Sequence, residues 1–132
     1  MSDQIKHECG IALVHLKKPL HFYQHKYGSY MYGVDKMFLM MEKQKNRGQD
    51  GAGYASIKFN LKPGQKYFYR VRSFEQQAIH SIFKKINKKI NSFLKSEKIK
   101  KGSDLFYEQA PFLGQVMLGH VRYGTYGKNS ID

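Results

Sequence analysis

The sequence predicts an α+β protein with mostly antiparallel strands and two amphipathic helices. Short apolar runs bounded by glycine, proline or asparagine recur along the chain, as is typical of strands. Two longer segments repeat apolar residues at intervals of three and four, which favours helices. A Pro-Gly turn separates two of the strands, and a turn of this kind joins neighbouring strands in antiparallel order.

The first element is a strand over residues 10–16, which are apolar and partly β-branched. It is expected to end before Pro19, because proline cannot donate to a strand ladder. Residues 21–33 are rich in aromatic side chains. They are predicted to be irregular, since Gly28 and Gly33 interrupt them.

The first helix is predicted from apolar residues at helical spacing, namely Val34, Met37, Phe38 and Met41. It is expected to stop near Asn46-Arg47-Gly48, because glycine is common just past a helix end. A tight loop over residues 49–53 follows. A hairpin is then predicted from an alternating strand over 54–59, a Pro-Gly turn over 60–65, and a strand carrying Tyr67, Tyr69 and Val71 on one face.

The second helix is expected to begin at Ser73 as N-cap, with Gln76 at the capping-box position. Its apolar stripe consists of Ile79, Ile82, Phe83, Ile86, Ile90, Phe93 and Leu94. After a basic linker, residues 115–122 are predicted to form a buried strand. Val116, Leu118, His120 and Arg122 would share one face of it, because side chains alternate along a strand.

Composition limits the class of protein. A length of 132 residues indicates one domain or part of one, and a polar start with no long apolar run argues against secretion and membrane spanning. One cysteine allows no internal disulfide, which fits a cytoplasmic protein. The net charge of +13 would suit nucleic acid. Eight lysines between Lys84 and Lys101 are interpreted first as a solvated helix face, so that a nucleic-acid partner is considered unlikely.

Three glycine-rich patches stand out, and each lies at the end of a predicted element. They are His7-Glu8-Cys9-Gly10, Asn46-Arg47-Gly48-Gln49-Asp50-Gly51-Ala52-Gly53 and Gly119-His120-Val121-Arg122-Tyr123-Gly124-Thr125. In this order they resemble the class II glutamine amidotransferases, which use an N-terminal cysteine as nucleophile. Gln49 makes the chain most similar to the amidophosphoribosyltransferase family within that class. At this position the asparagine synthetase branch usually carries Pro, and the fructose-6-phosphate branch usually carries Tyr.

The resemblance implies a four-layer αββα sandwich of the N-terminal-nucleophile type, truncated here. Residues 1–8 would be a leader, and residues 9–132 would form a partial glutaminase domain. The implied activity is hydrolysis of glutamine, with ammonia passed to phosphoribosyl pyrophosphate in the first step of de novo purine synthesis. The full-length protein would be a homo-oligomer. Any Mg²⁺ would belong to the absent phosphoribosyltransferase domain, and no cofactor or metal is expected in residues 1–132.

The resemblance also assigns roles to single residues. Cys9 would attack the Glu8 carbonyl to release the leader, and would then attack the side-chain amide of glutamine. Its freed α-amine would serve as general base, since such amines titrate near ~7.7–8. Arg122 would hold the substrate α-carboxylate and Thr125 would line the pocket. Arg47, Gly48 and His120 would support the site, with His120 expected to be a hydrogen-bonded core histidine rather than a catalyst.

One departure from the family concerns the oxyanion hole, which an Asn-Gly pair supplies there. No such pair follows Arg122, because Asn129 precedes Ser130, so residues 1–132 are expected to be inactive alone. Two alternatives stay open. One is the glutaminase domain of another class II amidotransferase, such as glutamate synthase. The other is a basic nucleic-acid-binding module. Without the three motifs, Cys9 would be interpreted as an inert buried cysteine.

Overall fold

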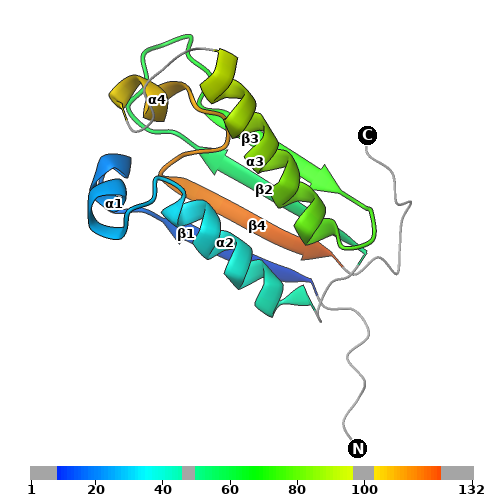
Figure 1. Cartoon of the computed structure of the whole chain (residues 1–132). Helices are drawn as coiled ribbons and strands as arrows, with labels where there is room; N and C mark the ends of the chain where they lie inside the picture. Colours follow the sequence, from blue (N-terminus) through cyan, green and yellow to red (C-terminus); the bar gives the residue numbers. More distant parts are fainter. Residues whose placement is uncertain (1–8, 46–49, 97–102, 123–132) are drawn as a thin grey trace, which may run out of the picture.

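The computed structural model describes residues 9–45, 50–96 and 103–122, in which four strands form one antiparallel sheet flanked by four helices (Figure 1). This confirms the predicted α+β class. In chain order the elements are β1 (Gly10–His15), α1 (Leu20–Tyr27), α2 (Tyr32–Lys43), β2 (Gly51–Ile57), β3 (Phe68–Ser73), α3 (Ala78–Ser96), α4 (Asp104–Gln109) and β4 (Val116–Arg122).

The strands lie in the order β1-β4-β2-β3, so the first and last strands of the described chain are neighbours. β1 pairs with β4 from Gly10↔Val121 to His15↔Val116. β2 pairs with β4 on one side and with β3 on the other. The predicted hairpin is therefore confirmed, and β1 and β3 are the two edge strands.

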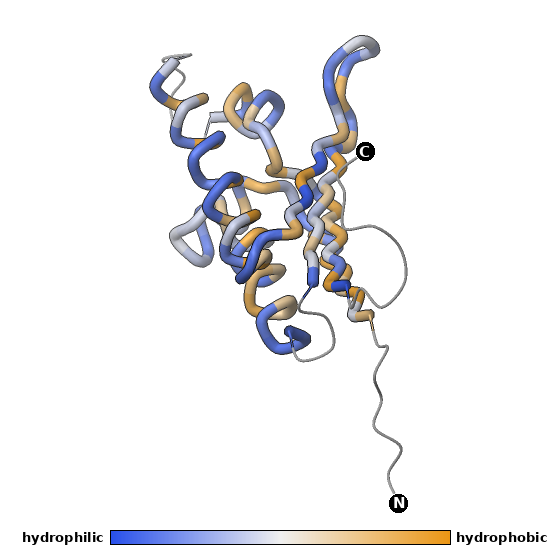
Figure 2. The backbone as a smooth tube through the Cα atoms, turned by 90° about the vertical axis from the view of Figure 1, so that its right-hand side faces the viewer, coloured by the Kyte–Doolittle hydropathy of each residue, from blue (hydrophilic) through white to orange (hydrophobic). Residues whose placement is uncertain are grey.

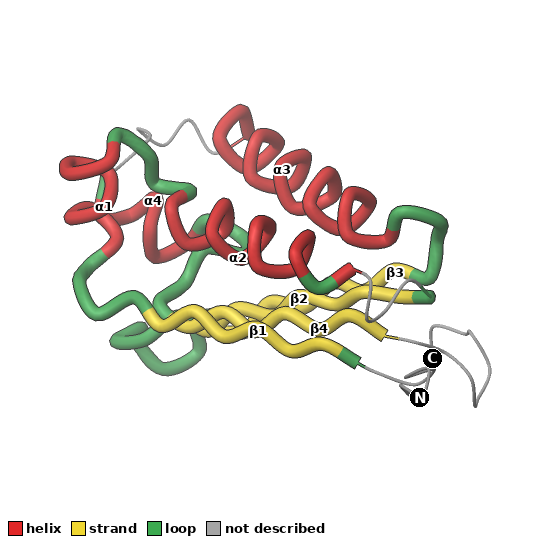
Figure 3. The backbone as a smooth tube through the Cα atoms, turned by 90° about the horizontal axis from the view of Figure 1, so that it is seen from below, coloured by secondary structure: helices red, strands yellow, loops and turns green. Residues whose placement is uncertain are grey.

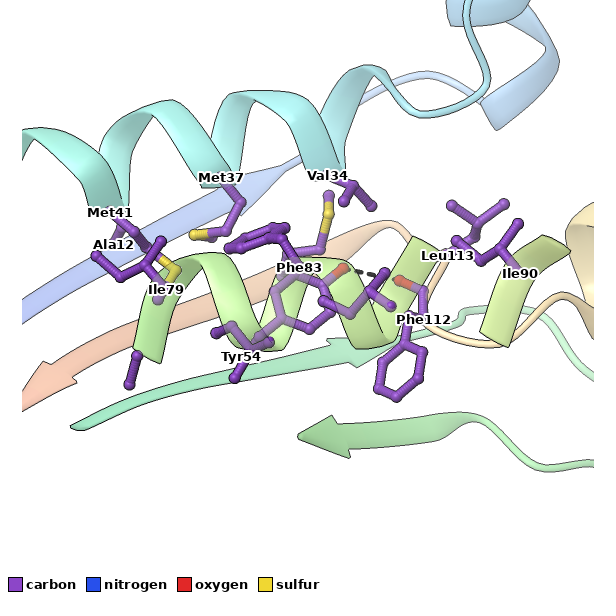
Figure 4. Close-up of a cluster of buried hydrophobic side chains, with 14 of the residues drawn as sticks. Ala12, Val34, Met37, Met41, Tyr54, Ile79, Phe83, Ile90, Phe112 and Leu113 are labelled. Carbon is purple, nitrogen blue, oxygen red and sulfur yellow. Dashed lines mark hydrogen bonds between the residues drawn. The ribbon is translucent and has the colours of Figure 1, made fainter. Parts of the chain in front are cut away.

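The helices lie on one face of this sheet, with α2 against β1 and β4 and with α3 against β2 and β3 (Figure 3). The hydrophobic core fills the space between them. Met37 and Met41 of α2, Ile79 and Phe83 of α3, and Tyr54 of β2 meet there (Figure 4). The apolar stripes that predicted both helices are thus the faces that pack on the sheet.

Glycine at position 119 lets α2 approach β4 closely. A Cβ on Gly119 would lie 2.6 Å from Met37 Sδ and 2.7 Å from Met41 Sδ, so both methionine side chains would have to shift to admit one. The methionine side chains fill this space, and their flexible thioethers suit an irregular gap. The helix is therefore seated directly over the strand that pairs with β1.

Tyr54 in β2 and Lys58 just after it carry polar groups that are buried on the helix side of the sheet. The Tyr54 hydroxyl donates to the Phe112 carbonyl at 2.7 Å, and burial raises the pKa of Tyr54 (Figure 4). Lys58, next after β2, is only 4% exposed. Its Nζ donates to the carbonyls of Tyr107 at 2.9 Å and Leu113 at 2.5 Å. Burial lowers the pKa of Lys58 to about 7.

The structure corrects four expectations. Within residues 21–33, predicted to be irregular, lies α1, which ends at Gly28 in the left-handed conformation (φ 74°). The short helix α4 was not predicted; its N-cap Ser103 accepts from the Phe106 N–H. β2 already begins at Gly51, inside the expected loop. Ser73 is not the cap of α3, because it ends β3 and its hydroxyl accepts from the Glu75 N–H instead.

The other face of the sheet is open in the part of the chain that the structure describes. Ile11, Leu13 and Leu118 are 68%, 59% and 46% exposed on it. The predicted burial of the last strand is thus correct for one face only. Figure 2 shows the sheet edge-on, with hydrophobic segments in the strands and the helices on one side only. None of the described helices is both long and apolar enough to cross a membrane.

We expect residues 1–132 to self-associate through this open face, and the double substitution Leu13→Lys/Leu118→Lys to weaken the association at least about tenfold. The two leucines lie directly opposite each other, and a charged group on each opposes burial of the face. Sedimentation velocity over a concentration series measures the effect. Leu105→Lys is the control, since Leu105 is 47% exposed on α4, away from the open face. A wild-type chain that stays monomeric at high concentration would refute the prediction.

Lys58 should make the free energy of unfolding depend on pH. Above about pH 7 the folded chain releases the Lys58 proton, whereas an unfolded lysine keeps it up to about 10.5. Stability should therefore rise with pH in this window, by up to about 1.4 kcal/mol per pH unit. Lys58→Met should remove this rise, measured by urea unfolding at pH 7, 8 and 9. The exposed Lys62→Met is the control, and equal slopes in all three proteins would contradict the assignment.

Candidate active site

The start of β1 and the end of β4 meet at one end of the sheet. Gly10 pairs with Val121, so Cys9 and Arg122, each the next residue outward along the chain, lie at the same end of the sheet. On its other side Arg122 pairs with Gly51, the first residue of β2. The end of α2 and the start of α3 lie at this end too (Figure 1). Two residues predicted for the site, far apart in sequence, are therefore brought together.

Strand alternation assigns these side chains to the open face. Gly10 and Val121 are buried toward the helices, whereas their neighbours Ile11 and His120 are exposed on the opposite side. By the same alternation Arg122 belongs to the open face. Cys9, one residue before β1, is exposed, so its thiol is accessible from solution.

Arg122 is held in place by its surroundings. Its guanidinium carbon lies 5.7 Å from the centre of the Phe74 ring, within the range of a cation–π contact. Its carbonyl accepts from the Asp50 N–H at 3.0 Å. A Cβ on Gly51 would lie 2.8 Å from Phe74 Cδ1, so glycine there makes room for the ring. Phe74 was missed in the sequence, since only the register of β2, β3 and β4 places it beside Arg122.

Gln44 is a second residue that the sequence did not single out. It is the C-cap of α2, and its backbone N–H donates to the Met41 carbonyl at 3.0 Å. Its side-chain Nε2 donates to the Ile11 carbonyl at 3.2 Å. The end of α2 is thereby tied to the strand residue two positions after Cys9.

The remaining predicted residues are placed differently or not at all. His120 is exposed on the open face of the described sheet, so the expectation of a core histidine is wrong here. The alternation along β4 is the reason, because it turns His120 away from the helices. Arg47, Gly48 and Thr125 lie outside the described residues.

A cleft of about 500 Å³ lies near this end of the sheet, between α2 and the start of α3. Glu42 pairs there with His80 at 3.2 Å and with Lys45 at 3.8 Å. The cleft is on the helix side, whereas Arg122 belongs to the other face, so the cleft is not a pocket shared by Cys9 and Arg122. No group of three or more metal-ligating side chains gathers in the described parts of the chain.

Comparisons with protein-family models, with curated proteins and with solved structures give no match for this chain.

Proposed function

We propose that this chain is the glutamine-hydrolysing part of a class II amidotransferase, most similar to amidophosphoribosyltransferase. The observation that carries the proposal is the pairing of β1 with β4, which brings the start of β1, next to the exposed Cys9, to the end of β4, where Arg122 lies. In the family that the three motifs resemble, a thiol and a carboxylate-binding arginine lie in one pocket. A fold that held these two residues apart would have opposed this function.

The chemistry follows from the two groups. Release of residues 1–8 would make Cys9 the first residue, with its α-amine beside its own thiol. The amine takes the thiol proton, and the sulfur attacks the side-chain carbonyl of glutamine. The proton passes to the leaving ammonia, and a γ-glutamyl thioester forms. Water then hydrolyses the thioester to glutamate, while the Arg122 guanidinium offers paired donors to the substrate α-carboxylate.

The proposed domain is a four-layer αββα sandwich, of which the described residues form one helix layer and one sheet. Support comes from the open face, where Ile11, Leu13 and Leu118 offer an apolar surface for a second sheet. Such a sheet would enclose Cys9 and Arg122 and would cover His120. It would also supply the second wall of the pocket, with the oxyanion donors that an Asn-Gly pair provides in the family, since residues 123–132 contain no such pair.

Two alternatives rank lower. The glutaminase domain of glutamate synthase would use the same cysteine. The molecule that accepts the ammonia would distinguish it from amidophosphoribosyltransferase. A basic nucleic-acid module rests on the lysines of α3, among them Lys84, Lys85, Lys88 and Lys89. These residues are exposed on the polar side of an amphipathic helix, as expected of a solvated face. We therefore favour the enzyme.

Cys9 should react selectively with a glutamine analogue. In the mature protein from cells, we expect a diazoketone analogue of L-glutamine to label Cys9 at a saturable rate, with protection by L-glutamine but not by D-glutamine. Intact mass should show that residues 1–8 are missing. Cys9→Ala should abolish both the labelling and the loss of the leader. A fully active protein that still begins at Met1 would refute the mechanism.

Arg122 should determine affinity for the substrate α-carboxylate. We expect Arg122→Lys to weaken protection of Cys9 by L-glutamine about 10- to 100-fold, since a lysine keeps the charge but loses the paired donors. The matched control is Arg70→Lys, an exposed arginine of β3 on the same face. Equal protection in the wild type and in Arg122→Lys would exclude this role.

A further inference from the structure

We propose that Gln44 is a positioning residue for Cys9, holding the strand on which the nucleophile is carried; the role in catalysis rests on the proposed function. Gln44 belongs to none of the three glycine-rich patches. The structure places it at the end of α2 beside the start of β1. It does not contact the reacting atoms and acts through the backbone of residues 10 and 11.

The outer edge of β1 is the reason such a tie matters. The Leu16 N–H points toward β4, where it donates to the Gln115 carbonyl at 2.7 Å. Backbone groups alternate in direction along an antiparallel strand, so Ile11 points its carbonyl away from β4. No neighbouring strand lies on that side in the described sheet. The side-chain amide of Gln44 occupies this position and donates to the Ile11 carbonyl at 3.2 Å.

The same amide fixes the residue that follows Cys9. A Cβ on Gly10 would collide with Gln44 Oε1, would lie 3.2 Å from Gln44 Cβ and would lie 2.7 Å from Val121 Cγ2. Gly10 thus lets the glutamine side chain reach across the start of β1. The strand is confined between Gln44 and Val121 at the point where Cys9 enters the site.

α2 gives the tie a firm base. Its buried face, with Val34, Met37 and Met41, is packed on the sheet, and a Cβ on Gly119 would meet both methionine sulfurs. Gln44 ends this helix one turn after Met41, whose carbonyl accepts from the Gln44 N–H. Motion of the Cys9 backbone relative to Arg122 is therefore resisted by the helix as well as by the β4 ladder.

Gln44→Met tests the inference, because it keeps the length of the side chain but removes both polar groups. In the mature full-length protein, we expect amide exchange at residues 10–12 to become about fivefold faster. The maximal rate of Cys9 labelling by the L-glutamine diazoketone should fall several-fold, with the concentration for half-maximal rate unchanged. Labelling by iodoacetamide and the unfolding temperature should stay close to wild type. Gln109→Met, at an exposed helix end, is the control for each measurement.

The outcomes separate the two proposals. If the wild type shows no saturable labelling of Cys9, the proposed function is refuted. Amide exchange at residues 10–12 would still test whether Gln44 holds the strand. Saturable labelling in the wild type with no change of rate in Gln44→Met would overturn only the role of Gln44 in catalysis. If amide exchange at residues 10–12 is the same in Gln44→Met as in Gln109→Met, Gln44 does not hold the strand, and the whole proposal is overturned.

Discussion

The antiparallel pairing of β1 with β4 is the constraint on which the rest of the structure depends. Six residue pairs join the first strand to the last, and β1 has no other neighbour in the described sheet. This ladder brings the start of β1 to the end of β4, and it completes the surface on which α2 packs. The close packing of α2 at Gly119 then holds β1 and β4 together from the helix side. A one-residue slip of β1 against β4 would turn the side chains of β1 to the other face of the sheet.

The two faces of the described sheet differ in what covers them. Toward the helices, Tyr54 and the methionines of α2 form an apolar core that excludes water. The opposite face carries Arg122 and His120, and Cys9 at the same end of the sheet is exposed as well. A reactive thiol on the helix side would have been buried beneath α2. The described helices thus leave one face of the sheet uncovered, and it is on this face that the proposed second sheet would pack.

Local patterns predicted much of the fold, whereas contacts between distant segments escaped them. The stripes of α2 and α3 and the β2–β3 hairpin could be read from periodicity and from the Pro-Gly turn. α1 carries aromatic residues without a clear apolar stripe, so no helical pattern revealed it. For the site, Cys9 and Arg122 came from motif order. Gln44 and Phe74 belong to no motif, and their roles depend on which strands become neighbours, a matter that one sequence does not encode locally.

The strand order also sets a sequence of events during synthesis. The hairpin of β2 and β3 closes over a short loop, whereas β1 waits for β4, about 100 residues later in the chain. At roughly 5–20 residues per second, the N-terminal thiol is made on the order of ten seconds before its partner arginine exists. Until β4 is made, β1 has no strand to pair with in the described sheet. Completion of the sheet therefore waits for the last described strand, and under the proposed mechanism the release of residues 1–8 would wait with it.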